Sequence, residues 1–515
     1  MTGKVIMTPY VLTVDRGSTN VKAVLFDTLG QEVRLASRPS QRPSSPHAGW
    51  CEQDMAQMWA DAAGAIRDVL SVDQGTPDIL GVFVTGQGNG LMPLDKDGRP
   101  SRAGILSLDS RATDILTGWK ADGRYMQAAQ TVGMPFAVGS PLPLLAWFKA
   151  NSPDEFAAMD KIVFSKDWIR QQLCGVLCTD PSDASGAGLM NLAQKRYAGE
   201  VFELLELDGI RSKLPDIRAS NEVVGHVTLA ASEATGLPVG TPVFCGAHDI
   251  GAFPFGVGSL DPRQLVSVVG TWGLNLLPVK DPAGAMAAFL HTVPEYFLAV
   301  FGDGNSGGCL DAMIKLLCAH ECDEATKEGI SVYHFIDRMI AGRKPSSVVF
   351  QPYMFGSPLN PLASAGLVGM RSWHERADVL RAIYEGIAFG HWANIQFIPG
   401  KEQLAAIWLI GGGSNSRMFG QLFADVTGLP VKVPRHKEVT ARGGALLALV
   451  GLGLFASYED ACREPELEAT YVPNDELRSY YQEKFQVFNA LFSTQSESWA
   501  ALNALERSVT TERIP

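Results

Sequence analysis

Short apolar runs that end at glycine-containing turns recur along this chain, and stretches with helical periodicity separate them. Residues 10–36 are typical of short strands joined by turns, and residues 80–95 of a strand, a glycine-rich loop and a second strand. Residues 54–70 carry apolar side chains at helical spacing, with an aspartate near the start, where the helix dipole favours negative charge. The pattern therefore predicts an α/β fold.

The same arrangement returns in the second part of the sequence. Residues 265–279 predict a strand, a turn and a strand, and residues 405–428 predict a strand, a turn and a helix. Two halves that each begin with a strand–turn–strand unit indicate a duplicated α/β architecture, although no sequence period accompanies it. We expect an N-terminal domain, a C-terminal domain and a helical tail, over residues 1–246, 247–490 and 491–515.

Length and charge narrow the functional classes. A chain of 515 residues is too long for one ordinary core, which also favours two domains or more. The net charge is -12, from 43 basic and 55 acidic residues, and no block of Lys and Arg offsets it, so we expect no binding to nucleic acid. The most apolar stretch, residues 445–456, is shorter than the roughly 18 residues that span a membrane, so no membrane partner is expected.

The cysteines predict a reducing environment. Eight cysteines are sparse for this length, and the pairs Cys174/Cys178 and Cys318/Cys322 lack the second pair that a zinc site requires. We therefore expect buried free thiols and a cytoplasmic protein. Pro9 and Asp15 interrupt the apolar text at the start, so we expect no signal peptide.

Three glycine loops follow apolar strands, at residues 16–20, 270–273 and 411–416. Glycine lets a backbone approach a ligand closely, and successive backbone N–H groups in such a turn can bind an anion. Any one of these loops would ordinarily be a tight turn. Three of them, each directly after a strand, favour phosphate binding, although none matches the GxxxxGK[ST] pattern of a P-loop.

The segment GDGNSGG at 302–308 satisfies two other motifs. As GxGxxG it lacks the acidic residue at the end of a second strand that a dinucleotide fold requires. As GxSxG it would make Ser306 the nucleophile of a hydrolase, with His374, His391 or His436 as partners, none of which the sequence singles out. A serine hydrolase is thus a minor alternative.

Two aspartates stand at the ends of predicted strands, one in each half. Asp249 lies among small residues in GAHDIGAFPFGVG, and Asp15 ends the first strand. A buried carboxylate is costly without a partner or a role. Asp249 could simply cap a helix and Asp15 could be a turn residue. The functional interpretation makes Asp249 a general base for a substrate hydroxyl and lets Asp15 face a magnesium ion through water, which with phosphate loops is typical of phosphoryl transfer.

Polar residues in otherwise apolar text are candidate substrate ligands. The amides of Gln87 and Asn89, in TGQGNG, can each donate and accept, as vicinal hydroxyls require. The segment SLDSRA adds Asp109 and Arg111. His248, beside Asp249, is more often a packed neighbour than a second catalytic group.

Taken together, these segments resemble the FGGY carbohydrate kinases of the sugar kinase/Hsp70/actin superfamily, over about residues 10 to 490 and in the family's order. DRGSTNVK resembles the first phosphate motif, with Ser18 where threonine is usual, and VVGTWG the second. GAHDIGAFPFGVG resembles the segment of the catalytic aspartate, and GGGSNSRMFGQLFADVTGLPV the adenosine motif. Residues 366–389 resemble the family's C-terminal signature.

The resemblance implies two ribonuclease H-like (actin-like ATPase) domains with the active site in the cleft between them. It implies ATP and Mg²⁺ as cofactors, Asp249 as the catalytic base that binds substrate, and Asp15 with Asp249 at the metal. It implies Gln87, Asn89 and Asp109 as substrate ligands. It places the nucleotide at Gly17, Ser18, Thr19, Lys22, Gly270, Thr271, Gly412, Gly413 and Ser416.

Within the family, GQGNGL, LSLDSRA and GTW are similar to the L-xylulose and 3-keto-L-gulonate kinase branch. Asn89 stands where the xylulokinase pattern GQMHG has histidine, and QGNG lacks the Arg-Glu pair of glycerol kinase. A small sugar, such as a ketopentose or a related keto-sugar acid, is the expected substrate. A polyol kinase, an actin- or Hsp70-like ATPase without kinase activity, and a homodimer remain open alternatives.

Overall fold

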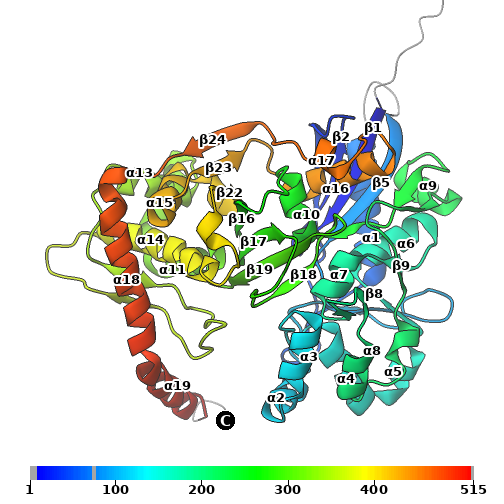
Figure 1. Cartoon of the computed structure of the whole chain (residues 1–515), viewed down its shortest axis with the longest axis horizontal. Coiled ribbons are helices and arrows are strands. Elements are labelled where there is room, and N and C mark those ends of the chain that lie inside the picture. The colour runs from blue at the N-terminus through cyan, green and yellow to red at the C-terminus, as the bar shows by residue number, and fades with distance from the viewer. Residues whose placement is uncertain (1–8, 72–76, 512–515) are drawn as a thin grey trace, which may run out of the picture.

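The computed structural model describes residues 9–71 and 77–511, and two mixed β-sheets form its framework (Figure 1). The first sheet has the strand order β13-β14-β5-β1-β2-β3, and β15 also pairs with β5. Its strands are β1 (Pro9–Arg16), β2 (Asn20–Phe26), β3 (Glu32–Pro39), β5 (Asp78–Gly86), β13 (Val223–His226), β14 (Pro242–Phe244) and β15 (Ala247–His248).

The second sheet repeats the plan of the first. Its order is β18-β19-β17-β16-β22-β23-β24. In each sheet the first strand pairs antiparallel with the next strand and parallel with a later one. Strand β1 pairs with β2 and then with β5, and β16 pairs in the same way with β17 and then with β22. The expected duplicated α/β fold is therefore confirmed. The strands are β16 (Gln264–Val269), β17 (Gly273–Val279), β18 (Ala288–Leu290), β19 (Phe297–Asp303), β22 (Ala406–Ile410), β23 (Val431–Pro434) and β24 (Leu467–Tyr471).

Alternate side chains of the first sheet pack into two different cores. Leu12 and Val14 contact a layer made by α1 (Met55–Leu70), α6 (Ser165–Cys174) and α9 (Leu229–Thr235). Helix α1 begins where the Asp54 carboxylate accepts hydrogen bonds from the next backbone N–H groups. On the other face, Val11 and Phe83 pack against α16 (Val439–Gly451) and α10 (Asp249–Gly256). A helix from late in the chain thus covers a sheet from its beginning.

The second sheet has its own helical layers. One face packs against α11 (Gly307–Leu317), α13 (Val332–Ile340), α14 (Arg376–Ile395), α15 (Arg417–Thr427) and α18 (Arg478–Thr494). The other face, which includes Trp408, contacts α10 through Phe253. Because α10 also reaches the first sheet through Phe255, it lies between the two sheets.

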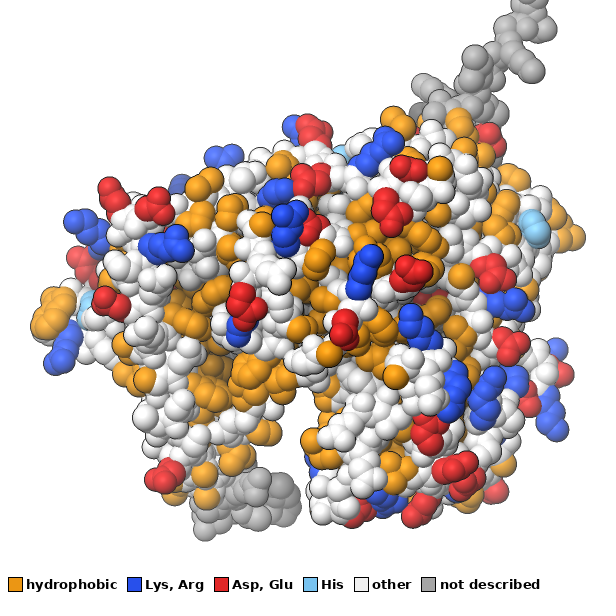
Figure 2. All heavy atoms as spheres, viewed as in Figure 1, with side chains coloured by type: hydrophobic (Ala, Val, Ile, Leu, Met, Phe, Trp, Pro, Cys, Tyr) orange, Lys and Arg blue, Asp and Glu red, His pale blue; other side chains and the backbone are white. Residues whose placement is uncertain are grey.

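A mainly helical region between β5 and β14 forms a separate core beneath the first sheet, at the lower right of Figure 1. Its helices are α2 (Thr113–Ala121), α3 (Arg124–Val132), α4 (Pro141–Asn151), α5 (Pro153–Ala158), α7 (Pro181–Gly186) and α8 (Gly199–Leu204). This region also contains short two-stranded sheets. Their strands are β4 (Glu52–Gln53), β6 (Met92–Leu94), β7 (Gly104–Ile105), β8 (Lys161–Val163), β9 (Cys178–Thr179), β10 (Met190–Asn191), β11 (Arg196–Tyr197) and β12 (Asp216–Ile217). Figure 2 shows a deep notch between this region and the lobe that carries α18.

The remaining elements belong to the second half. They are α12 (Ala319–Glu328), β20 (Val349–Gln351), β21 (Gly366–Val368), α17 (Tyr458–Ala461) and α19 (Ser496–Thr511). Helix α19 occupies most of the expected tail, and residues 512–515 lie outside the described part. The division at 246/247 stays a prediction, and β15, which starts at Ala247, is a strand of the first sheet. Within the described ranges, none of the helices has the length and apolar character that crossing a membrane requires.

Candidate active site

The two aspartates singled out from the sequence lie at one edge of the first sheet. Strands β1 and β15 both run parallel to β5, and Asp15 and Ala247 are both in register with Thr85. Because parallel strands end at the same edge, Asp15 at the end of β1 and Asp249 just after β15 come close together. We expected one acid from each half of the molecule. The structure instead places both on the first sheet, because the strand that leads to Asp249 joins it.

Asp249 has one oxygen engaged and one available. Its Oδ1 accepts a hydrogen bond from the backbone N–H of Ile250 at 2.7 Å and lies 3.2 Å from Nε2 of His248. Its Oδ2 has no such partner among the described residues, and 28% of the side chain is exposed. Burial, and then the negative charge of Asp15, raise the pKa of Asp249 to about 7. This combination suits a base that works near neutral pH.

The buried carboxylate of Asp15 accepts a side-chain hydrogen bond from the neighbouring strand β5. The hydroxyl of Thr85 donates to its Oδ1 at 3.0 Å. Burial raises the pKa of this carboxyl, and the hydrogen bond from Thr85 and the charge of Lys22 only partly oppose that shift. His248, by contrast, is neutral at pH 7, because burial lowers its pKa to about 4.

The first glycine loop connects β1 to β2 and faces solvent. The N–H of Gly17 donates to the carbonyl of Asn20 at 3.0 Å, which closes the turn, and Ser18 and Thr19 are exposed. Lys22 follows on β2, and its ammonium forms an ion pair of 2.8 Å with Glu438, at the start of α16. The loop therefore presents hydroxyls and backbone beside Asp15.

The second and third loops line one cavity of about 610 Å³. Gly270 and Thr271 form one wall, and Gly412, Gly413 and Ser416 form another. Ser416 caps α15 by accepting from the N–H of Phe419 at 2.9 Å, and its hydroxyl donates to Asp337 at 2.9 Å. The structure thus brings together all five residues that the resemblance assigned to the nucleotide in this half.

Sequence reasoning missed the part of this cavity that α13 lines. Ser331, Tyr333, His334 and Asp337 line it from α13 and from the residue that caps this helix. These residues have no motif spacing, since they belong to an ordinary amphipathic helix. Only the three-dimensional packing of α13 on α14 and α15 identifies them.

The GxSxG match at Ser306 forms a hydrogen-bonded chain that is closed to solvent. Ser306 Oγ lies 3.0 Å from His391 Nε2, and His391 Nδ1 lies 3.1 Å from the amide oxygen of Asn275. Ser306 is 1% exposed and His391 is 3% exposed, so no substrate reaches the hydroxyl. The N–H of Gly307 donates to the carbonyl of Gly270 at 2.8 Å. This segment therefore supports the second glycine loop, at residues 270–273.

Gln87 and Asn89 follow β5 directly and lie at the same edge as Asp15. The backbone N–H of Gln87 donates to the carbonyl of Arg16 at 3.1 Å. Asn89 has a left-handed backbone with φ 63, and its buried side-chain oxygen has no partner among the described residues. A donor is therefore needed at Asn89, and a substrate hydroxyl would supply one.

The side-chain oxygens of Asp109, unlike that of Asn89, have hydrogen-bond partners within the protein. Arg111 donates to Oδ1 at 2.8 Å and to Oδ2 at 2.7 Å, and the backbone N–H of Cys51 also donates to Oδ2. The Arg111 guanidinium lies 3.8 Å from the ring centre of Trp50 and also pairs with Glu52. Both oxygens of Asp109 are thus occupied within the protein.

A buried charge cluster lies behind the segment that carries Asp249, and the sequence did not indicate it. The ammonium of Lys166 is within 3.4 Å of three carboxylates, those of Asp167, Asp180 and Asp183. The hydroxyl of Ser182, between two of them, accepts from the backbone N–H of His248 at 3.1 Å. The cluster therefore anchors the residue that precedes Asp249.

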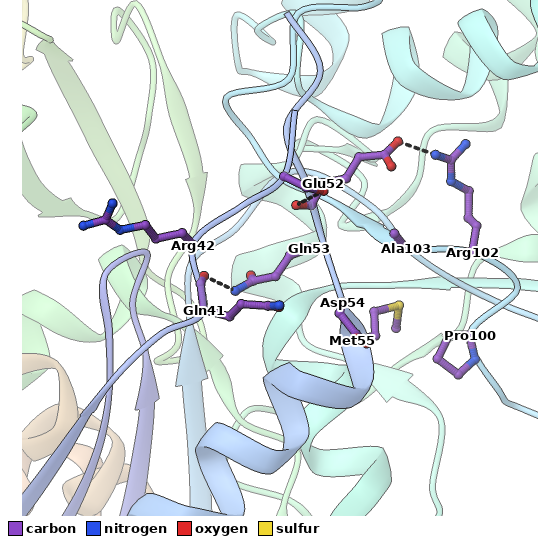
Figure 3. A pocket seen from close by; sticks show the side chains of 10 residues that line it. Gln41, Arg42, Glu52, Gln53, Asp54, Met55, Pro100, Arg102 and Ala103 are labelled. Carbon is purple, nitrogen blue, oxygen red and sulfur yellow. Dashed lines mark hydrogen bonds and ion pairs between the residues drawn. The ribbon is translucent and has the colours of Figure 1, made fainter. Parts of the chain in front are cut away.

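A separate cavity of about 330 Å³ lies over the start of α1 (Figure 3). Gln53 and Arg102 line it, and the amide of Gln53 donates to the carbonyl of Gln41 at 2.8 Å. Arg16 donates to the side-chain oxygen of Gln53 and thus connects this wall to the first glycine loop. Neither Asp15 nor Asp249 lines this cavity.

The carboxylates at the sheet edge suit magnesium in the form that phosphoryl-transfer sites use. Within the described ranges, no three His, Cys, Asp or Glu side chains gather in a cluster that could hold a metal ion. Magnesium is usually bound by one or two carboxylates together with substrate phosphates and water. Asp15 and Asp249, as oxygen ligands at the edge of the sheet, fit this description.

Models of both domains of one enzyme family match the chain. The model described as "FGGY family of carbohydrate kinases, N-terminal domain" matches residues 10–256, and that of the C-terminal domain matches residues 265–452. A probable L-xylulose kinase of Pasteurella multocida is 30% identical over 94% of this chain and 98% of its own length. An L-xylulose/3-keto-L-gulonate kinase of Escherichia coli is 28% identical over 95% and 97%. An autoinducer-2 kinase of Photorhabdus laumondii is 28% identical over 94% of each chain.

Solved structures agree on the fold. A ligand-bound xylulose kinase of Lactobacillus acidophilus superposes with a TM-score of 0.87, at 22% identity, over 96% of this chain and 100% of that one. A xylulose kinase of Rhodospirillum rubrum gives a TM-score of 0.82, at 26% identity, over 95% and 100%. A glycerol kinase of Plasmodium falciparum, solved with ADP, gives 0.82, at 18% identity, over 95% and 98%.

Proposed function

This chain belongs to the FGGY family of carbohydrate kinases, and on that premise we propose that it transfers the γ-phosphoryl group of ATP to a hydroxyl of a ketopentose or a related keto-sugar acid. One observation carries the proposed site. Asp15 lies near the end of β1 and Asp249 directly follows β15, and both strands pair with β5 at Thr85, near the point where the Gln87–Asn89 loop begins. A metal-facing acid, a base and sugar ligands are thereby grouped at one place.

In this proposal Asp249 is the base. Its Oδ2 accepts the proton of the substrate hydroxyl while that oxygen bonds to the γ-phosphorus, the bond from phosphorus to the bridging oxygen breaks, and ADP leaves. The N–H of Ile250 on Oδ1 fixes the orientation of the carboxylate. The raised pKa of Asp249, about 7, makes it basic enough to accept the proton near neutral pH.

The nucleotide occupies the cavity of about 610 Å³ in the second half, with its phosphates at Gly270 and Thr271. Gly17, Ser18 and Thr19 meet the terminal phosphate from the first half, and Lys22 adds a positive charge. Asp15, together with Asp249, would hold a magnesium ion, which would neutralise charge on the phosphates. Gly412, Gly413 and Ser416 lie against the adenosine.

The sugar binds beside Asp249 against Gln87 and Asn89. The unpartnered oxygen of Asn89 accepts from a sugar hydroxyl in this arrangement. Relatives named L-xylulose kinase and L-xylulose/3-keto-L-gulonate kinase support a ketopentose or its acid as substrate. Both oxygens of Asp109 are occupied by Arg111, so Asp109 does not contact the sugar in this arrangement. It supports the site indirectly, by fixing Arg111 and the segment that carries it.

The substrate proposal is tested by measuring ADP release with a matched panel: L-xylulose, D-xylulose, 3-keto-L-gulonate, erythritol and autoinducer-2. We expect the highest kcat/KM with L-xylulose or the keto acid. Turnover confined to autoinducer-2, which the name of another relative makes a specific second candidate, would replace the sugar assignment. Turnover confined to erythritol would instead establish a polyol kinase.

A further inference from the structure

One ion pair joins two segments that are 416 residues apart, at the border of the nucleotide cavity. The ammonium of Lys22, on β2, donates to both carboxylate oxygens of Glu438, at 2.9 and 2.8 Å. Glu438 is 12% exposed and Lys22 is 33% exposed. Both carboxylate oxygens therefore face one ammonium, and two contacts restrict the flexible lysine more than one contact would.

This pair lies where two cavities meet. A cavity of about 210 Å³ is lined by Lys22 and Glu438 together with Gly411, Gly412 and Asn415. Gly412 and Asn415 also line the cavity of about 610 Å³ that we assign to the nucleotide. Phosphates that extend from the larger cavity toward Asp15 would pass the ammonium of Lys22.

The carboxylate of Glu438 is not used by its own helix. Glu438 occupies the capping position of α16, yet its side chain accepts no hydrogen bond from the first N–H groups of that helix. A carboxylate at this position ordinarily stabilises the helix end. Here it extends to β2 instead, so its contacts serve Lys22.

The chemistry of lysine explains why such a partner matters. An ammonium has three N–H donors, of which two point at Glu438, so one is left for an anion. The long lysine stem loses about 2 kcal/mol of rotamer freedom when it is fixed. A phosphate that meets an ammonium already held in place does not have to order it, and it therefore binds more tightly.

We propose that Glu438 is a positioning residue, which holds the Lys22 ammonium at the junction of the two cavities for contact with the phosphates of the nucleotide. This inference rests on the proposed function, because it takes the larger cavity as the nucleotide site. It assigns Glu438 a role that acts through Lys22 and not through contact with ATP.

The test measures ADP binding by calorimetry without sugar, in the wild type and in Glu438→Ala, Glu438→Gln, Lys22→Ala and the double variant Lys22→Ala/Glu438→Ala. We expect Glu438→Ala to weaken ADP binding about tenfold, because the phosphate would then have to order the Lys22 side chain itself. The isosteric Glu438→Gln keeps the volume and one acceptor oxygen, so it should lose less and should fold if the alanine variant does not. The double variant should bind no more weakly than Lys22→Ala alone.

The matched control is Glu464→Gln, which breaks a Lys–Glu pair of 2.7 Å with Lys432 on β23 and should leave ADP binding unchanged. Unchanged binding in both Glu438 variants would overturn the proposal, as would tighter binding, which would mean that Glu438 restrains Lys22. A further loss on the Lys22→Ala background would also overturn it, because Glu438 would then act independently. If the wild type itself binds no ADP, the nucleotide assignment fails instead.

Discussion

The segments 247–251 and 107–111 each carry an aspartate in apolar surroundings, and the two aspartates differ in how many hydrogen-bond donors the protein supplies to them. Asp109 accepts four hydrogen bonds on its two oxygens, from the guanidinium and backbone N–H of Arg111 and from the N–H of Cys51, and its side chain is completely buried. Asp249 receives one backbone hydrogen bond, and burial and Asp15 raise its pKa to about 7. Both carboxylates lie in apolar surroundings, so the number of hydrogen-bond donors around each one, and not burial alone, is the difference between them.

The difference has a physical basis. A buried carboxylate is tolerated when donors replace the water that it loses, and removing one partner of a buried ion pair is strongly destabilising. A carboxylate without donors keeps a high proton affinity, which is what a general base requires. The two segments therefore predict opposite responses to the same Asp→Asn change.

The largest effect is expected for Asp249→Asn. The amide cannot accept the hydroxyl proton, so kcat should fall by about 10³ or more, while ADP binding is retained. Coupled assays of ADP release and calorimetry with ADP measure the two properties. Turnover at the wild-type rate would show that Asp249 is not the base.

The same variant should be more stable than the wild type above neutral pH. The folded pKa of Asp249 is about 7, against an ordinary value of 3.8, so ionisation destabilises the fold progressively as pH rises between these values. We expect the difference in Tm between Asp249→Asn and the wild type to grow from about pH 4 to about pH 7 and then to level off. A difference that does not change with pH would contradict the raised pKa.

Asp15→Asn should have the next largest effect on activity. Its loss removes a metal ligand and the second cause of the high pKa of Asp249. We expect a higher magnesium requirement and an acid limb of kcat/KM that moves to lower pH, because the Asp249 carboxyl is then easier to ionise. Rate profiles from pH 5 to 9 at saturating magnesium separate the two effects, and an acid limb that stays in place would argue against contact between these acids.

Asp109→Asn should mainly reduce stability. It leaves the Arg111 guanidinium with Glu52 as its remaining carboxylate partner, which should lower the free energy of unfolding by about 3 kcal/mol. Urea unfolding measures this loss, and kcat of the folded enzyme should change little. A stable variant with a greatly raised KM for sugar would restore Asp109 as a direct substrate ligand.

Gly443→Ala tests how far the position of Asp249 depends on packing. A Cβ at Gly443, in α16, would lie 2.3 Å from the carbonyl of Ala252 in α10, the helix that Asp249 begins. We expect a loss of about 1–3 kcal/mol of stability and a lower kcat, because α10 must shift. Gly118→Ala, in α2, is the control, since a Cβ there meets nothing within 4 Å. Equal effects of the two changes would dismiss the packing argument.

Ser306→Ala should have the smallest effect. The change removes one buried hydrogen bond to His391, worth about 1 kcal/mol, and leaves the second phosphate loop in place. ADP-release rates should stay within a few-fold of the wild type. Complete loss of turnover would give Ser306 a chemical role that its burial contradicts.

Much of this arrangement could be predicted from the sequence, because local patterns determine it. The strand–turn–strand units at 10–36 and 265–279 indicated the duplicated fold, and the glycine loops at 270–273 and 411–416 line one cavity, although phosphate binding there stays a prediction. Asp15 and Asp249 could be recognised because each ends an apolar run. The surroundings of Asp109 were not predictable, since the N–H of Cys51 that donates to Asp109 and the Glu52 carboxylate that pairs with Arg111 come from a distant segment.

Other features depend on contacts between distant parts of the chain. Lys166, Asp180 and Asp183 carry no motif, and only folding gathers them behind His248. The division of the chain into consecutive halves likewise conceals that α16 packs on the first sheet, because its apolar periodicity does not reveal which surface it covers.

That packing has a consequence for synthesis on the ribosome. Strand β1 emerges at the start of translation, yet the helix that shields Val11 and Phe83 is completed only at Gly451. Until then this side of the nascent sheet lacks the part of its cover that α16 supplies, and only earlier elements such as α10 pack there. A fragment that stops before Val439 would keep that part exposed, so a split version of this enzyme should need both pieces present together.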